Sequence, residues 1–171
     1  MAEASFDFLR ALVIEDNAHM RTLLRSLMHA LGIKQVIECP DGAAGYEELR
    51  LKRPDFVLTD LSMKPIDGIE FTKMVRTSKD SPNPYVPIIM VTGHTERARV
   101  EAARDAGVTE VLAKPITAQN LLLRIAEIVE KPRSFVRCDT YFGPDRRRHH
   151  DETRPGPFRR KDDYNDDLAV Q

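Results

Sequence analysis

The stretch Phe56-Val57-Leu58-Thr59-Asp60 decides the fold, because it is a short apolar run that ends at a carboxylate. A run without polar alternation is typical of a strand buried on both faces, as in a parallel sheet. We therefore expect a strand over Phe56–Thr59. Runs of the same kind occur at four further places, which are Ala11–Ile14, Val36–Cys39, Ile88–Val91 and Val111–Ala113.

Amphipathic segments separate these runs. In each of them apolar residues recur at steps of three and four, as they do on one face of a helix. The expected helices begin after Asn17, at Gly42 behind a cap at Asp41, after Asp67-Gly68, at about Glu96 and after a cap at Thr117. Strand and helix thus alternate five times, which predicts an α/β fold with a parallel sheet and helices on both faces.

The composition supports one globular domain with an appended tail. The 171 residues are 42% hydrophobic and 31% charged with a net charge of −1, which excludes collagenous, coiled-coil and wholly disordered chains. No apolar run is long enough to span a bilayer, and the acidic start does not fit a secretory signal. Two cysteines are typical of a reducing compartment. We expect a domain over residues 8–131 and an extended or disordered, irregular tail over 132–171, rich in Arg, Pro and Gly.

Polar side chains follow the expected strands, at the edge where ligands of such sheets gather. They are Glu15 and Asp16 after the first strand, Asp60 after the third, Thr92 after the fourth and Lys114 after the fifth. Clustered carboxylates without cysteine or histidine favour Mg²⁺, which completes its coordination with phosphate oxygens. We expect Asp60 to be a nucleophile that forms an acyl phosphate, while Thr92 and Lys114 hold the phosphoryl oxygens.

Several motifs resemble those of the receiver domains of two-component response regulators, of the stand-alone type found among chemotaxis regulators. They are Leu12-Val13-Ile14-Glu15-Asp16-Asn17, Val57-Leu58-Thr59-Asp60-Leu61-Ser62-Met63, Asp67-Gly68, Met90-Val91-Thr92-Gly93, Ala106-Gly107 and Ala113-Lys114-Pro115. The resemblance implies a flavodoxin-like, doubly wound sheet of five parallel strands in the order 2-1-3-4-5. It also implies a cytoplasmic setting and a phosphoryl donor that is a sensor histidine kinase or a histidine phosphotransfer protein.

The same resemblance implies roles for individual residues. Asp16 and Asp60 would contact Mg²⁺ directly, Glu15 through water and Ser62 through its backbone carbonyl. It also implies a cis peptide bond between Lys114 and Pro115.

The chain departs from the family pattern at two positions. Lys64 stands where the family has proline, with Pro65 next, and Val111 stands where the family has Tyr or Phe. Because valine has no ring to rotate, we expect phosphorylation to be transmitted by the loop after Thr92. Ser62 and His94 would border the path of the water that removes the phosphate, and so tune its lifetime.

The tail combines aromatic residues with arginine clusters. We expect Phe135, Tyr141 and Phe142 to dock on the domain or on a partner. The arginines Arg146, Arg147 and Arg148 would meet an anionic partner. Segments 143–148 and 156–161 share a Gly-Pro-X-Arg-Arg-basic pattern, which is a weak internal repeat.

The leading interpretation is a response regulator that accepts a phosphoryl group from a histidine kinase onto Asp60 and signals by phosphorylation-dependent binding to a target protein. It would be a phosphoacceptor switch that catalyses its own phosphorylation and dephosphorylation, not an enzyme acting on other substrates. The alternatives are a phosphorelay shuttle or phosphate sink, and a nucleic-acid-binding regulator that uses the arginine tail. A dehalogenase-type phosphohydrolase is disfavoured, because Ser62 occupies the place of its second aspartate.

Overall fold

The computed structural model describes residues 6–93 and 97–147. Five parallel strands form a central sheet in the order β2-β1-β3-β4-β5, as the resemblance implies. Strands β1, β3 and β4 are almost entirely buried on both faces, which explains their uninterrupted apolar sequences. The strands are β1 (Arg10–Ile14), β2 (Gln35–Cys39), β3 (Phe56–Asp60), β4 (Ile88–Thr92) and β5 (Glu110–Ala113).

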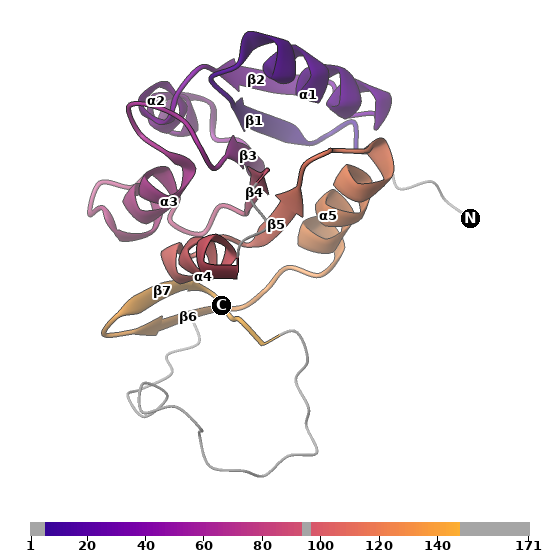
Figure 1. Cartoon of the computed structure of the whole chain (residues 1–171). Coiled ribbons are helices and arrows are strands. Elements are labelled where there is room, and N and C mark those ends of the chain that lie inside the picture. The colour runs from indigo at the N-terminus through magenta and orange to yellow at the C-terminus, as the bar shows by residue number, and fades with distance from the viewer. Residues whose placement is uncertain (1–5, 94–96, 148–171) are drawn as a thin grey trace, which may run out of the picture.

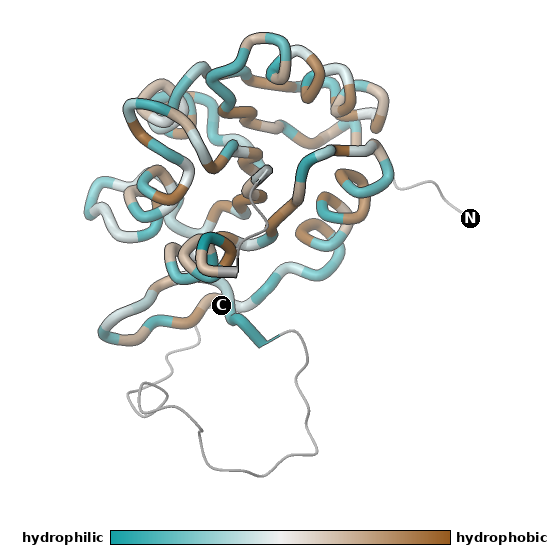
Figure 2. The backbone as a smooth tube through the Cα atoms, viewed as in Figure 1, coloured by the Kyte–Doolittle hydropathy of each residue, from teal (hydrophilic) through white to brown (hydrophobic). Residues whose placement is uncertain are grey.

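Helices cover both faces of this sheet (Figure 1). One face carries α1 (Ala18–Ala30) and α5 (Ala118–Glu130), whose apolar sides form a core with residues of β1, β3 and β4. The other face carries α2 (Gly42–Lys52), α3 (Gly68–Thr77) and α4 (Arg97–Ala106) over a second core. In Figure 2 the apolar residues accordingly gather along the strands and on the inner sides of the helices. In the described part of the chain, no helix is long and apolar enough to cross a membrane.

Four of the predicted helix starts are confirmed by their caps, while the start expected at about Glu96 lies outside the described residues. Asn17 accepts hydrogen bonds from the backbone of His19 and Met20, and Asp41 and Thr117 cap α2 and α5 in the same way. Asp67 forms a capping box with Glu70 at the start of α3. The strand ends differ from expectation by one residue, because polar residues at strand ends still pair in the ladder although they interrupt the apolar run.

The prediction of an irregular tail is wrong for its first part. Strands β6 (Phe135–Cys138) and β7 (Tyr141–Pro144) form an antiparallel hairpin. The hairpin packs against α3 and α4 through the rings of Phe135 and Phe142, which meet the ring of Tyr85 with centroids 5.2 and 5.4 Å away. These strands are short and one contains Gly and Pro, so their pairing depends on the surface that receives them and not on a pattern of their own.

Close backbone contacts and buried polar groups hold the hairpin in place. Gly107 has a φ of +99°. A Cβ atom on Gly143 would lie 2.9 Å from the Cα atom of Gly107. The buried guanidinium of Arg76 donates to the carbonyls of Gly107 and Pro84, at 3.0 and 2.7 Å. Arg76 also lies 5.0 Å from the centroid of the Phe135 ring. These contacts pack the hairpin against the domain that the parallel sheet forms.

Candidate functional site

Three carboxylates meet at the carboxyl edge of the sheet. Glu15 and Asp16 follow β1, Asp60 ends β3, and one oxygen atom from each lies within 4.8 Å of those of the others. Glu15 and Asp60 are buried, while Asp16 is exposed. The strand order places β1 beside β3, so residues 45 positions apart in the sequence come together at this edge.

The Glu15 carboxylate is only partly satisfied by hydrogen bonds. Its Oε1 atom accepts from the backbone N–H of Asn17 at 3.1 Å, but its buried Oε2 atom has no hydrogen-bond partner. Burial raises the pKa of Glu15 above 4.5, and the charge of Asp60 raises it further, against the lowering effects of the Asn17 N–H and the Lys114 ammonium. A nearby cation would stabilise the charged form of this buried carboxylate.

Within residues 6–93 and 97–147, Lys114 supplies the one ammonium group recorded against this cluster. Its Nζ atom lies 2.9 Å from Oδ1 of Asp60 and 3.8 Å from Oε2 of Glu15. Burial alone would lower the pKa of Lys114, but the hydrogen bond to Asp60 and the charges of Asp60, Glu15 and Asp16 raise it above 10.5. Lys114 therefore remains charged at neutral pH and orients the Asp60 carboxylate.

The side chains at this edge fit a magnesium ion. Three carboxylates against one ammonium leave negative charge in excess, and the unsatisfied Oε2 atom of Glu15 offers a lone pair beside the other oxygen ligands. A site with oxygen ligands only is typical of Mg²⁺. This acidic triad is typical of the magnesium site of receiver domains.

Backbone contacts fix the strand ends around Asp60. Its second oxygen, Oδ2, accepts from the N–H of Ser62 at 3.0 Å. The N–H of Lys114 donates to the carbonyl of Thr92 at 2.9 Å, so β4 and β5 present these two residues side by side. The peptide bond between Lys114 and Pro115 is cis, as expected, and a second cis bond joins Lys64 and Pro65.

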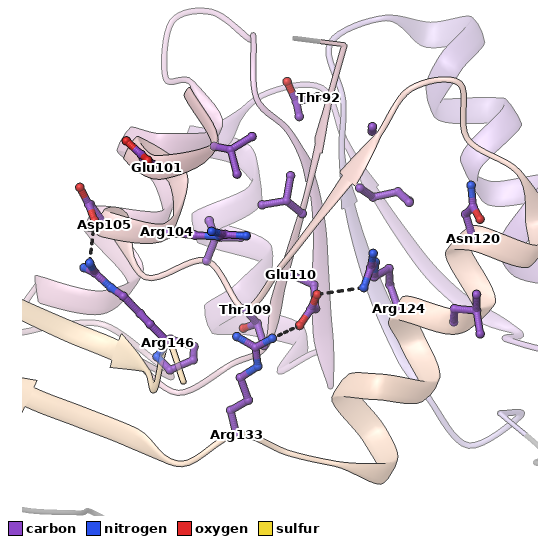
Figure 3. A pocket seen from close by; sticks show the side chains of 17 residues that line it. Thr92, Glu101, Arg104, Asp105, Thr109, Glu110, Asn120, Arg124, Arg133 and Arg146 are labelled. Carbon is purple, nitrogen blue, oxygen red and sulfur yellow. Dashed lines mark hydrogen bonds and ion pairs between the residues drawn. The ribbon is translucent and has the colours of Figure 1, made fainter. Parts of the chain in front are cut away.

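The structure places the remaining expected residues in three different regions. Val111 is half-buried on β5 and lines a groove. Thr92 lines the same groove and is labelled in Figure 3. Phe135 and Phe142 lie in the hairpin core, Tyr141 begins β7, and Arg146 and Arg147 follow β7. His94 and Arg148 lie outside the described residues.

Three site residues went unnoticed in the sequence as parts of the site. Asn17 binds Glu15 besides capping α1, and Arg21, one helical turn later, donates to the carbonyl of Glu15 at 2.6 Å. Arg99 of α4 reaches the hydroxyl of Ser62 in a long contact of 3.5 Å. Arg21 follows the cap residue Asn17 by four positions, and this spacing could have indicated that its side chain lies near Glu15. No local pattern in the sequence marks Arg99.

Comparison with known proteins agrees with this geometry. The chain is 32% identical over 123 residues to the chemotaxis protein CheY of Pseudomonas aeruginosa, which covers 72% of this chain and 98% of that protein. It is 30% identical over 123 residues to chemotaxis protein CheY-3 of Vibrio cholerae, covering 72% and 93%. The solved structure of Vibrio cholerae CheY4 matches with a TM-score of 0.65 at 25% identity, over 71% of this chain and 98% of the other.

The family match spans the part of the chain that carries the acidic cluster. Residues 11–126 match the response regulator receiver domain. The matched residues include every strand of the parallel sheet except the first residue of β1. The hairpin lies beyond the matched residues. The acidic pocket, the sheet order and this match together show that the chain belongs to the response regulator receiver family and takes part in two-component signalling.

Proposed function

We propose that the chain accepts a phosphoryl group from the phosphohistidine of a sensor histidine kinase or a histidine phosphotransfer protein onto Asp60. The phosphorylated form then signals by binding a target protein. The observation that supports this most directly is the position of the Asp60 carboxylate, held by the Lys114 ammonium at 2.9 Å and by the N–H of Ser62 at 3.0 Å beside two further acids. The proposal includes the cytoplasmic setting that the family resemblance implies.

The chemistry follows from what each side chain offers. A carboxylate oxygen of Asp60 attacks phosphorus, the P–N bond of the phosphohistidine breaks, and the leaving imidazole keeps the electron pair and takes up a proton. The Lys114 ammonium and the Thr92 hydroxyl bind phosphoryl oxygens, which is the positioning and charge stabilisation that this reaction needs. Asp16, Asp60, the carbonyl of Ser62 and Glu15 would hold Mg²⁺, and the bound ion would supply positive charge that offsets the negative charge remaining at the site.

Loss of the phosphate uses the same residues. A water molecule attacks phosphorus, the bond to Asp60 breaks, and inorganic phosphate leaves as the carboxylate is restored. Ser62 is exposed and small, so water has access from its side of the site. The chain is therefore a switch whose phosphorylated state decays by its own hydrolysis.

The arginine-tail alternative, a nucleic-acid-binding regulator, has less support from the structure. Arg146 pairs with Asp105 at 2.8 Å and lies over the ring of Tyr141 at 4.2 Å, so it is held against the domain. A shuttle or phosphate sink differs from the proposed switch only in lacking phosphorylation-dependent binding, which the following experiment measures.

The test combines phosphorylation with binding. Wild type incubated with Mg²⁺ and acetyl phosphate should gain one phosphoryl adduct at Asp60 by mass spectrometry, and Asp60→Asn should gain none. Asp80→Asn, at an exposed aspartate outside the site, is the matched control and should behave as wild type. Target proteins should be captured with the beryllofluoride-treated wild type and not with treated Asp60→Asn. An adduct at another residue would refute the proposed role of Asp60, and equal capture by both proteins would favour a shuttle or sink.

A further inference from the structure

A wide groove lies between α4 and α5, over β5 (Figure 3). Its volume is about 1120 Å³, larger than the usual pocket for a small ligand. Thr92 lies at its upper end, beside the acidic cluster, and Pro144 and Arg146 line its other end. The groove therefore runs from the phosphorylation site to the point where the chain leaves the hairpin.

Small and exposed apolar side chains form its floor and one wall. Val111 is half-buried in the floor, and Leu123 of α5 is 58% exposed. Helix α4 packs on α3 and on β7, and the groove separates it from α5. Apolar surface that stays open to solvent beside a functional site is typical of a binding surface.

The groove also carries an excess of positive charge. Its lining includes the four arginines Arg104, Arg124, Arg133 and Arg146 against the three acids Glu101, Asp105 and Glu110. The buried Glu110 is shared by Arg124 and Arg133, and Asp105 pairs with Arg146. Arg104 takes part in none of the ion pairs recorded for residues 6–93 and 97–147. The groove therefore fits an occupant that combines carboxylates with apolar side chains.

We propose that this groove binds residues 162–170 of the same chain. Their sequence is Asp162-Asp163-Tyr164-Asn165-Asp166-Asp167-Leu168-Ala169-Val170, with four carboxylates and four apolar or aromatic side chains. The negative charges of these carboxylates complement the positive charges of the arginines that line the groove. Tyr164 and Leu168 complement the open surface at Val111 and Leu123, where this chain has valine and not an aromatic ring.

The connection between groove and segment is short enough. The described chain stops at Arg147, one residue after Arg146, which itself lines the groove. The residues between Arg147 and Asp162 can span up to about 50 Å at full extension. A tethered segment also acts at an effective concentration of about millimolar, so weak contacts are enough to hold it.

Docking of this segment would cover the surface next to Thr92. A partner that reads the β5 face then competes with residues 162–170 for the same arginines and apolar side chains. Only this consequence rests on the proposed function, since the docking itself requires neither phosphate nor metal.

The test measures the position of the segment in the full-length chain. A nitroxide is attached at Asn165→Cys in a Cys138→Ser background, where the remaining Cys39 is buried and stays unlabelled. In unphosphorylated, metal-free protein, the NMR signals of Val111 and Leu123 should lose most of their intensity. The signal of Leu51, 66% exposed at the end of α2, should keep its intensity.

Three controls test the charges. The combined variant Asp162→Asn, Asp163→Asn, Asp166→Asn and Asp167→Asn, or Arg104→Glu alone, should restore the groove signals. Raising the salt to about 1 M, where the screening length is about 3 Å, should do the same. The proposal is overturned if Val111 and Leu123 keep their intensity, if Leu51 is affected equally, or if the four Asn substitutions change nothing.

A mixture separates contact within one chain from contact between copies. Nitroxide-labelled chains without isotope are mixed with isotope-labelled chains without nitroxide. Loss of the groove signals in this mixture would overturn the intrachain proposal. The Asp60→Asn variant should dock its segment as wild type does, so failure of the phosphorylation proposal would leave this result unchanged.

Discussion

At the scale of single residues, Asp60 depends on a glycine from the next helix. A Cβ atom on Gly68 would lie 2.3 Å from the backbone oxygen of Asp60, well inside contact distance. The N–H of Gly68 also donates to the carbonyl of Leu61 at 3.0 Å. The start of α3 is thus packed directly against the end of β3, where the proposed phosphoacceptor Asp60 lies.

Gly68→Ala should therefore lower stability and slow phosphorylation. We expect a loss of about 1–3 kcal/mol in the free energy of unfolding, because the added methyl displaces backbone and not a flexible side chain. Gly93→Ala is the matched control beside the same site, since among the described residues its Cβ would meet Lys114 alone, at 3.9 Å. Urea unfolding and adduct formation measure both effects, and equal behaviour of the two variants would contradict the packing argument.

A buried thiol gives the fold a dependence on alkaline pH. Cys39 is 2% exposed at the end of β2, and burial, with the charges of Glu48 and Asp41, raises its pKa from 9.0 to about 11. The folded state holds this proton more tightly than the unfolded state does. The resulting stability is fully present below pH 9.0 and is lost as the pH rises through about 11.

Cys39→Ala should reduce the decrease in the free energy of unfolding at alkaline pH. Wild type should lose about 2–3 kcal/mol more than the variant between these pH values, since each pKa unit corresponds to about 1.4 kcal/mol. Cys138→Ala, at the half-buried cysteine of the hairpin, should keep the wild-type slope. Urea unfolding at a series of pH values compares the slopes, and parallel curves for all three proteins would refute the assignment.

At the scale of elements, the hairpin is bound to the domain by aromatic packing more than by its own ladder. Phe135 and Phe142 are buried, and their rings meet with centroids 5.6 Å apart beside Tyr85. A two-stranded hairpin alone is at best marginally stable in water. Its order therefore depends on the surface formed by the ends of α3 and α4.

Phe142→Ala should release the hairpin and lower the free energy of unfolding by about 3 kcal/mol or more, the usual cost of truncating a buried ring. Arg137→Ala is the control on the same hairpin. Its guanidinium lies 4.4 Å over the Phe142 ring at an exposed position, so its loss should cost about 1 kcal/mol or less. Thermal unfolding and amide hydrogen exchange of β6 and β7 report the difference, and equal losses would contradict it.

At the scale of the whole molecule, the acidic cluster couples stability to magnesium. Glu15, Asp16 and Asp60 lie at the ends of two strands and repel one another, and the single charge of Lys114 offsets only part of this repulsion. A ligand that binds only the folded state stabilises it by about 2.7 kcal/mol at a hundred times its dissociation constant. The cluster should therefore make thermal stability depend on Mg²⁺.

Mg²⁺ should raise the melting temperature of wild type, and Asp16→Asn should abolish most of that rise. In EDTA, Asp16→Asn should be at least as stable as wild type, because it removes one of the repelling charges. Differential scanning calorimetry with and without Mg²⁺ measures both. A variant that gains as much from Mg²⁺ as wild type would exclude Asp16 as a ligand.

The groove bears on how phosphorylation is transmitted through the molecule. Val111 lies in the groove floor, and the structure has no aromatic ring at that position. Val111→Tyr should leave phosphorylation of Asp60 intact, since the side chain lies outside the acidic cluster. Thr92→Ala should weaken phosphorylation-dependent binding. Adduct formation and target capture test the pair, and loss of phosphorylation in Val111→Tyr would contradict transmission through the loop after Thr92.

The sequence by itself determined the sheet, most helix starts and the five polar residues at the ends of four strands. Buried parallel strands require unbroken apolar runs, caps require Asn, Asp or Thr, and the carboxyl ends of parallel strands share one edge, so each of these features has a local signature. Only the tertiary structure decided the hairpin, the contact of Arg99 with Ser62 and the groove over β5. They depend on surfaces that segments distant in the chain build together, and no short stretch such as Tyr141–Pro144 encodes the surface against which it will pack.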